Sequence, residues 1–485
     1  MILAIDQGTT GTTGLVVDEA GSVLGRGYRE IEQHYPHAGW VEHDPDEIWQ
    51  SVLLVGAAAL RDAGVDAHRL RAIGITNQRE TVVAWDRRSG RPLHRAIVWQ
   101  DRRTAARCDE LREGGYEPLV RERTGLVLDP YFSGTKLEWL FRTGGVPSGA
   151  AVGTIDSWLA FKLTGEHVTD PSNASRTLLY DLRRRVWDDE LCTLLGVPTA
   201  SLPSVCPTAG ELGETAAFGG SVPVCAIVGD QQAALYGQRC RESSTAKRTY
   251  GTGNFLLRAM GSAEPAPVDG LVTTVAWQVG DRFDYALEAS IFVTGAAVQW
   301  LRDALGIIRD AEETEALAAS LPSNDGVYFV PALTGLGSPH WDPYARGTIV
   351  GLTRGAGRAH LARAALEAIA YQTLDAVREQ DAALQQPLVE LRADGGATAN
   401  AWLMQFQADL LGVPVVVSPL AETTALGAAY LAGIATGCWA ESDLDRLTAE
   451  PRRYEPRASR GESAERELAD WRRAVEHARH WAATQ

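Results

Sequence analysis

A short pattern that occurs twice constrains the fold of this chain more than any other feature. Near the N-terminus, the apolar residues 1–5 lead into the sequence DQGTT at residues 6–10, and a second apolar run follows. Near the middle, the sequence YGTG at residues 250–253 is again flanked by extended and apolar residues. Each copy predicts two strands joined by a glycine turn. Two such units, one early in each half, favour an α/β chain with two related domains whose turns face a shared ligand.

The length leads to the same expectation, because 485 residues exceed what one ordinary hydrophobic core fills. The polar stretch 238–246 is the best candidate for a boundary, so we expect domains over residues 1–240 and 241–485. From about residue 441 the sequence is rich in Arg and Glu and predicts a loop and a peripheral terminal helix over residues 463–482.

Charge and composition exclude several classes of protein. A formal net charge of −16 argues against a nucleic-acid surface. No stretch is long and apolar enough for a transmembrane helix, and the N-terminus is too short and unbasic, before Asp6, for a signal peptide. The six cysteines form no CxxC pair, so neither a zinc site nor a disulfide framework is expected. We therefore expect a cytoplasmic protein without membrane insertion.

Helix signals agree over residues 44–63. Asp44 can cap the helix, Pro45 suits its first position, and Glu47 is placed to complete a capping box. Gly64 is the expected stop.

An Arg-Glu pair follows the short apolar run 70–75, which predicts a buried strand. Arg79 donates in a fixed fork and Glu80 accepts, so together they can grip adjacent hydroxyls of a small polyol. Trp99 could cover the carbon backbone of such a ligand, and Tyr131 could bond a hydroxyl. The alternative is that Arg79 and Glu80 form a surface salt bridge, and that Trp99 and Tyr131 are ordinary core residues.

The first glycine turn has the ingredients of a phosphate site. Its backbone N–H groups and threonine hydroxyls can donate to phosphate oxygens. Asp6, at the end of the preceding strand, is placed to hold Mg²⁺, usually through water.

A second carboxylate, Asp230, follows the apolar strand 224–228 and is a candidate general base for a substrate hydroxyl. The alternative role is that of N-cap for the helix that begins near Gln232. These two roles do not exclude each other.

A third turn, DGGA at residues 394–397, joins an apolar strand over 388–393 to a helix over 399–411. Its glycines allow close approach of a ligand, and the helix N-terminus offers free N–H groups. Asn400 is expected to point from the first turn toward a ribose or purine edge.

These motifs stand in the order found in a known family. The chain resembles the FGGY carbohydrate kinases, and its NQRET segment is typical of the glycerol kinases among them. The matching segments are DQGTT (6–10), GITNQRET (74–81), DPYFSGTK (129–136), NASRT (173–177), GDQQAA (229–234), YGTG (250–253), DPYARG (342–347) and DGGA (394–397).

The resemblance implies two actin/hexokinase-like (ribonuclease H-like) domains around a central nucleotide and substrate cleft. It implies ATP-dependent phosphorylation of glycerol to sn-glycerol 3-phosphate, with Mg²⁺, and a homo-dimer or homo-tetramer is expected. Asp230 would be the general base and Asp6 would lie at the metal. The implied glycerol-binding residues are Arg79, Glu80, Trp99, Tyr131, Asp230 and Gln231. The implied ATP- or ADP-binding residues are Thr10, Gly11, Thr12, Thr252, Gly295, Gln299, Gly396 and Asn400.

One departure from the family pattern concerns residue 13. Related sequences usually carry an Arg there that reaches the nucleotide phosphates, whereas this chain has Thr13. Two alternatives stay open beside a glycerol kinase. One is a kinase for another short polyol or triose. The other, which Thr13 suggests, is a nucleotide-binding homologue with weakened catalysis.

Overall fold

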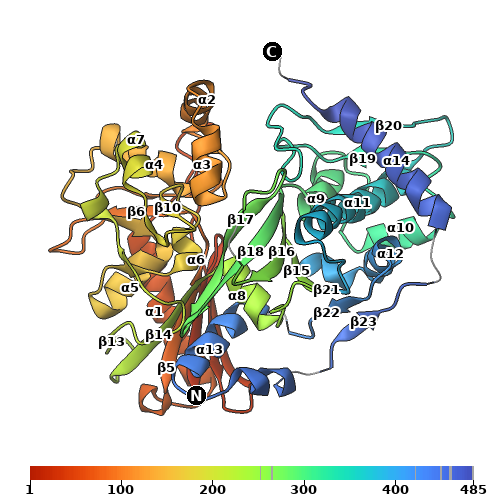
Figure 1. The fold of residues 1–485 in the computed structure, drawn as a ribbon. Coiled ribbons are helices and arrows are strands. Elements are labelled where there is room, and N and C mark those ends of the chain that lie inside the picture. Colours follow the sequence, from red (N-terminus) through yellow and green to blue (C-terminus); the bar gives the residue numbers. More distant parts are fainter. Residues whose placement is uncertain (252, 264–265, 421, 448–449, 458–460, 483–485) are drawn as a thin grey trace.

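The computed structural model describes residues 1–251, 253–263, 266–420, 422–447, 450–457 and 461–482. Two mixed β-sheets form its framework, and helices cover their faces (Figure 1). The six-stranded sheet has the order β13 (Glu214–Thr215), β14 (Val222–Gly229), β5 (Ala72–Asn77), β1 (Ile2–Gln7), β2 (Gly11–Val17), β3 (Val23–Glu30). The seven-stranded sheet has the order β17 (Val272–Val279), β18 (Arg282–Ile291), β16 (Asn254–Gly261), β15 (Thr245–Tyr250), β21 (Glu390–Asp394), β22 (Val415–Val417), β23 (Arg452–Tyr454).

The two sheets share one topology. In the first, β3, β2 and β1 are antiparallel, and β5 and β14 then continue parallel to β1. In the second, β18, β16 and β15 are antiparallel, and β21 and β22 continue parallel to β15. The repeat expected from the two glycine turns is therefore confirmed as a repeat of strand order, and the α/β fold class is confirmed with it.

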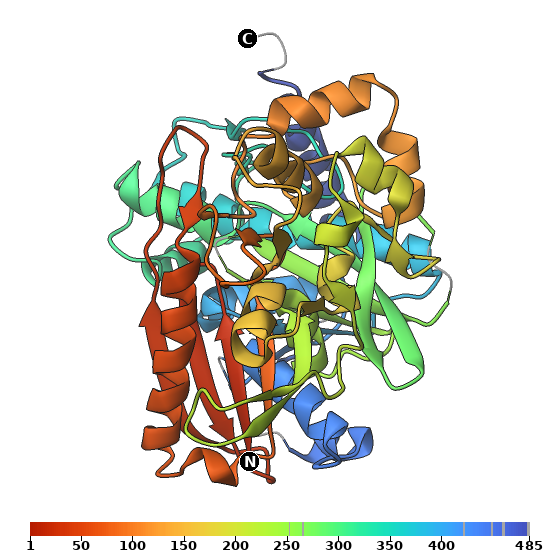
Figure 2. The same cartoon turned by 90° about the vertical axis from the view of Figure 1, so that its left-hand side faces the viewer.

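Helix α1 (Pro45–Asp62) covers one face of the first sheet, as Figure 2 shows. Asp44 caps it as expected, because its side chain accepts the N–H groups of Asp46 and Glu47. The expected capping box is wrong. The Glu47 carboxylate accepts the N–H of Glu32 at 3.2 Å, so it links the segment that follows β3 to the helix.

An insertion in the first half carries a four-stranded sheet and several helices, which lie above the first sheet in Figure 1. Its elements are β4 (Glu42–His43), β7 (Ala96–Ile97), β6 (Val82–Trp85), β8 (Ala151–Thr154), α2 (Ala105–Glu113), α3 (Glu117–Thr124), α4 (Ser133–Arg142), α5 (Ile155–Thr164), α6 (Pro171–Ala174) and α7 (Asp189–Leu194).

The second sheet is covered by α9 (Gly295–Asp303), α10 (Glu313–Ala319), α11 (Arg358–Leu384), α12 (Ala401–Leu411) and α14 (Gly461–Ala478). The last part of the chain packs into the second half and is not a peripheral helix. β23 extends the sheet, and Leu468 and Trp471 of α14 are buried in the core that α11 also lines. None of the described helices has the length and apolar character needed to cross a lipid bilayer.

Helix α13 (Thr423–Ala435) comes from the second half of the sequence but packs against the first sheet and against α8 (Asp230–Gly237). The approach is close because glycines stand at the contacts. A methyl group added at Gly427 would lie 1.9 Å from the carbonyl oxygen of Ala233, and one added at Gly74 would lie 2.3 Å from that of Ala428.

Replacement of Gly427 by Ala should therefore force α13 and α8 apart. We expect a loss of about 1–3 kcal/mol of stability, the usual cost of overpacking, seen as a lower urea midpoint. Gly149→Ala is the matched control, because a methyl group there meets no atom within 4 Å and the backbone is not left-handed. Equal midpoints for the two variants would contradict this account of the helix contact.

Candidate functional site

The Arg79-Glu80 pair lies in a tight turn between β5 and β6. The N–H of Thr81 donates to the Arg79 carbonyl at 2.7 Å, and Glu80 has a φ of 63°. Left-handed backbone is uncommon for a residue with a long side chain, and such strain persists only where surrounding contacts hold it. Here the Ser133 hydroxyl donates to the Glu80 carbonyl at 2.9 Å.

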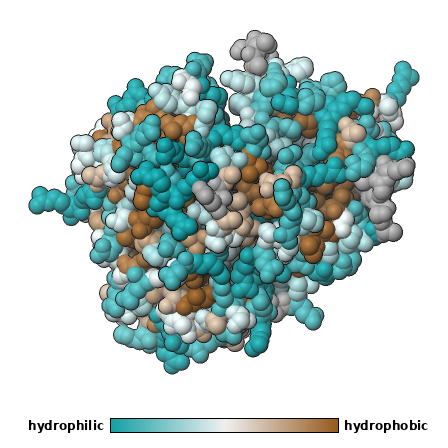
Figure 3. All heavy atoms as spheres, in the orientation of Figure 1, coloured by the Kyte–Doolittle hydropathy of each residue, from teal (hydrophilic) through white to brown (hydrophobic). Residues whose placement is uncertain are grey.

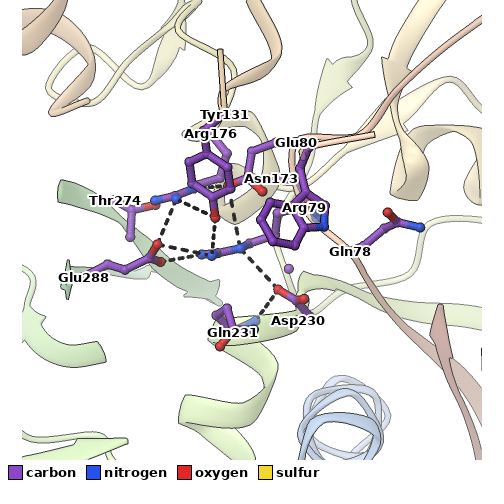
Figure 4. Close-up of polar contacts among 12 residues, drawn as sticks. Gln78, Arg79, Glu80, Tyr131, Asn173, Arg176, Asp230, Gln231, Thr274 and Glu288 are labelled. Atoms are coloured by element: carbon purple, nitrogen blue, oxygen red, sulfur yellow. Dashed lines mark hydrogen bonds and ion pairs between the residues drawn. The ribbon is translucent and has the colours of Figure 1, made fainter. Parts of the chain in front are cut away.

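Both side chains of the pair enter a buried ion cluster (Figure 4). Arg79 contacts the Glu288 carboxylate at 2.5 and 3.2 Å. Arg176 donates to Glu80 at 2.6 Å and to Glu288 at 2.9 Å. The Tyr131 hydroxyl lies 3.2 Å from Arg79. Side-chain exposure of these four charged groups is 2% or less, so the interpretation as a surface salt bridge is wrong.

The two buried arginines balance the two buried glutamates. Burial alone would raise the pKa of Glu288, but Arg176 and Arg79 outweigh it and lower that pKa to about 2. For Glu80, burial dominates and raises the pKa, although Arg79 and Arg176 oppose it. The two arginines therefore stabilise the charge of Glu288 more than that of Glu80.

Asp230 is the first residue of α8, so it is not the helix cap; Gly229 occupies that position without a side-chain hydrogen bond. The Asp230 carboxylate lies 3.2 Å from Nε of Arg79 and keeps 26% of its surface exposed. Burial raises its pKa more than Arg79 and Lys247 lower it. An accessible carboxylate with a raised pKa beside a fixed cation has the properties of a general base.

Aromatic rings line the same space. The rings of Trp99 and Tyr131 meet edge to face at 5.6 Å between centroids, and Phe255 stacks on Tyr131 at 6.5 Å. The Arg79 guanidinium lies 5.5 Å from the centre of the Phe255 ring. These surfaces suit the carbon chain of a small polyol, while the ion cluster and Asp230 suit its hydroxyls.

Asp6 is the penultimate residue of β1 and lies opposite Thr13 of β2, and paired residues of neighbouring strands share one face of the sheet. Burial raises the pKa of Asp6 to about 7, with further contributions from Asp230 and Glu422. No described donor hydrogen-bonds the Asp6 side chain, and the described residues contain no group of three metal-ligating side chains. Repelling carboxylates fit Mg²⁺, which binds through one or two carboxylates and completes its shell with water and phosphate oxygens.

A cavity of about 430 Å³ opens in the second half, between α9, α12 and the turn after β21. Four of the expected nucleotide-binding residues line it together: Gly295, Gln299, Gly396 and Asn400. Asn400 caps α12, because its side-chain oxygen accepts the Leu403 N–H at 2.9 Å. Its amide donates to Thr314 at 3.2 Å, so its free reach toward a ligand is smaller than expected.

The turn at Gly395 needs glycine. Its φ is 92°, and a methyl group there would lie 2.4 Å from the Tyr250 carbonyl oxygen. Beside it, polar side-chain atoms are buried without a hydrogen-bond partner in Thr249, Asn254, Thr294 and Asp394. Because buried polar groups are rarely left unpaired, these atoms indicate that a polar ligand completes the region.

The residues of the first hairpin differ in how accessible they are to a nucleotide. Thr10 is exposed at its tip, and Gly11 is buried. The Thr12 hydroxyl bonds Ser51 of α1 at 2.6 Å, so its side chain points away from the face that carries Asp6 and only its backbone can serve a nucleotide. Thr252 lies outside the described residues.

Four residues of the site were not predicted as site residues: Glu288, Arg176, Phe255 and Lys247. Lys247 of β15 is fully buried and donates to the side chain of Gln231, next to Asp230. Burial lowers its pKa to about 8, although Asp394 and Asp230 counteract the effect. A signal was present for Arg176, which lies in the NASRT segment, and for Lys247, one of three lysines in the chain.

Comparisons with known proteins identify the family of this chain. The models of the N-terminal and C-terminal domains of the FGGY family of carbohydrate kinases match residues 1–237 and 246–436. Glycerol kinases of Dechloromonas aromatica and Trichlorobacter lovleyi are 56% and 55% identical to this chain, with 99% of it covered and 98% and 99% of theirs. The crystal structure of Plasmodium falciparum glycerol kinase with ADP superposes with a TM-score of 0.90 at 34% identity, with 98% of both chains covered. The chain belongs to the FGGY family of carbohydrate kinases.

Proposed function

We propose that this protein transfers the terminal phosphoryl group of ATP to glycerol, giving sn-glycerol 3-phosphate and ADP. The observation that carries the proposal is the grouping of buried Arg79 and Glu80 with the partly exposed Asp230, beside the rings of Trp99 and Phe255. It offers charged donors and acceptors to hydroxyls and apolar rings to a short carbon chain. The similarity to glycerol kinases along the whole chain supports the same substrate.

Asp230 acts as the base that takes the proton from the attacking hydroxyl. Its contact with Arg79 fixes the carboxylate, and its partial exposure leaves an oxygen free for the substrate. Glu80 and Arg79 orient the other hydroxyls, with Gln231 and Tyr131 beside them. In phosphoryl transfer most of the acceleration comes from such positioning and from charge neutralisation.

The nucleotide occupies the cavity lined by Gly295, Gln299, Gly396 and Asn400. Mg²⁺ at Asp6 would neutralise phosphate charge when bound. We propose functional units over residues 1–240 and 241–485; the ranges of the two family models, which end at 237 and begin at 246, support this division.

A weakened homologue is the second candidate, and Thr13 is the observation that favours it. A coupled assay with ATP, Mg²⁺ and a panel of polyols and trioses separates the possibilities. Turnover of glycerol in preference to dihydroxyacetone and erythritol supports the proposal. Preference for another acceptor, or nucleotide binding without turnover, would refute it.

Asp230→Asn should lower kcat by roughly 10²–10⁴-fold, the usual contribution of a general base, while circular dichroism stays unchanged. Asp284→Asn is the control, because Asp284 is a buried carboxylate that bonds Trp277 and Arg282 outside the cluster. Near-normal turnover in a folded Asp230→Asn variant would show that Asp230 is not the general base.

Glu80→Gln keeps the shape of the side chain but removes its charge. We expect the KM for glycerol to rise by about 10-fold or more, since a lost charged hydrogen bond costs about 1.5–3 kcal/mol, with little change in the KM for ATP. Glu42→Gln is the matched control, because Glu42 is another buried glutamate paired with an arginine, Arg103. Equal changes in both KM values would instead indicate a structural role for Glu80.

Thr13→Arg should lower the KM for ATP or raise kcat by about 10-fold, since it adds a charge-assisted bond to phosphate. Thr13 shares the sheet face of Asp6, and Tyr28 is its exposed neighbour on β3. Leu24→Arg adds the same charge at an exposed position of β3, at the end of the strand away from the first hairpin, and should change neither constant. If Thr13→Arg also changes neither constant, the phosphates are held by other groups.

A further inference from the structure

A second cavity lies on the side of the molecule away from the ion cluster, where the end of α8 meets β21, β22 and α13. Its volume is about 300 Å³, at the lower end of the range for small-ligand pockets. Figure 1 shows these elements converging near the base of the molecule, and Figure 3 shows that the surface in this view is largely hydrophilic.

Two buried side chains that line this cavity lack hydrogen-bond partners. Gln238 is 5% exposed, and neither its amide nitrogen nor its amide oxygen is bonded. Tyr430 is fully buried, and its hydroxyl is unpaired as well. Native structures rarely leave such groups unsatisfied, so three unpaired atoms around one cavity indicate a polar occupant.

The cavity also carries an uncompensated positive charge. Arg392 and Arg453 contact Glu390 at 2.8 and 2.5 Å, and Arg453 also contacts Glu455 at 2.5 Å. Asp445 pairs with Arg241 at 2.8 Å. Arg239 is left without an ion-pair partner among the described residues.

One guanidinium nitrogen of Arg239 donates to the Leu444 carbonyl at 3.0 Å, but its Nε is buried and unbonded. A partly buried guanidinium without a carboxylate is a ready site for an oxyanion.

The position of Arg239 connects the cavity to the catalytic parts. Arg239 follows α8, whose first residue is Asp230, and its φ of 58° is a left-handed conformation that a non-glycine residue seldom adopts. Arg392 of β21 donates to the Gln238 carbonyl at 2.6 Å, and the same strand ends at Asp394 beside the nucleotide cavity. The cavity thus joins the segment after α8 to the strand that carries the glycine turn.

We propose that this cavity binds a small hydroxylated phosphate ester, and that its occupancy changes turnover by fixing the segment after α8 against the second sheet. The Arg239 guanidinium donates to the phosphate group. The Tyr430 hydroxyl and the Gln238 amide nitrogen, which are shielded from the cavity in this structure, turn toward the phosphate when it binds. The Gln238 amide oxygen accepts from a hydroxyl on the carbon chain. The volume admits a phosphate with a few carbon atoms.

The test is calorimetric titration of the whole protein with glycerol 2-phosphate, with the cleft filled by ADP and glycerol. This binding measurement does not depend on the proposed function. We expect saturable binding in the millimolar range, weakened roughly tenfold or more by Arg239→Gln and several-fold by Tyr430→Phe, since each removes a donor to phosphate. Arg452→Gln removes the same charge from a neighbouring exposed arginine that does not line the cavity, and it should bind like the parent.

Three outcomes would overturn the proposal. They are absence of saturable binding, affinity that survives both Arg239→Gln and Tyr430→Phe, and equal affinity for inorganic phosphate, which would assign the site to the free ion. Tyr430→Phe guards against loss of folding in the arginine variant, because it removes only a hydroxyl. A steady-state assay completes the test: the ester must change kcat in the parent and in Arg452→Gln but not in Arg239→Gln. Binding without any change in kcat would refute the link to turnover.

Discussion

The Glu288 carboxylate is shared by two arginines, and the arrangement of the site depends on this contact. Glu288 comes from β18 of the second sheet, whereas Arg79 and Arg176 come from the first half of the chain. Removal of the carboxylate would leave Arg176 with Glu80, and Arg79 with the more distant Glu80 and the partly exposed Asp230. That is a costly loss for two buried cations in a region of low dielectric. The contact therefore fixes the two halves together where the polyol hydroxyls are to be held.

The two halves of the chain contribute different parts of the site. In the proposed site, the first half supplies Asp230, Asp6 and the groups proposed to bind hydroxyls, and the second half supplies the glycine turn at Gly395 and the cavity proposed for the nucleotide. Lys247 of the second sheet bonds Gln231 of α8, so a second polar contact crosses between the halves beside Asp230. Neither half contains a complete site, which is how a kinase can couple the chemistry to the presence of both substrates.

Local signals predicted much of the fold because strands, caps and glycine turns are set by near neighbours in sequence. The Asp44 cap, the paired glycine turns and the strand before Asp230 are of this kind. The capping role of Glu47 failed because Glu32, fifteen residues away, offered a competing N–H. Glu288 could not be identified from local signals. It is one carboxylate within a strand, and its role depends on its contact with Arg79, more than two hundred residues earlier.

The crossing of α13 onto the first sheet has a consequence for how the chain acquires its structure. Ile2, Ala4 and Leu15 share a core with Ala428, Ala429 and Ala432, so one face of the first sheet is completed by residues made near the end of synthesis. During translation that face remains uncovered until residue 435, the end of α13, has left the ribosome. The first half cannot mature as a finished domain ahead of the second, and a chain that stops early exposes an apolar sheet to aggregation.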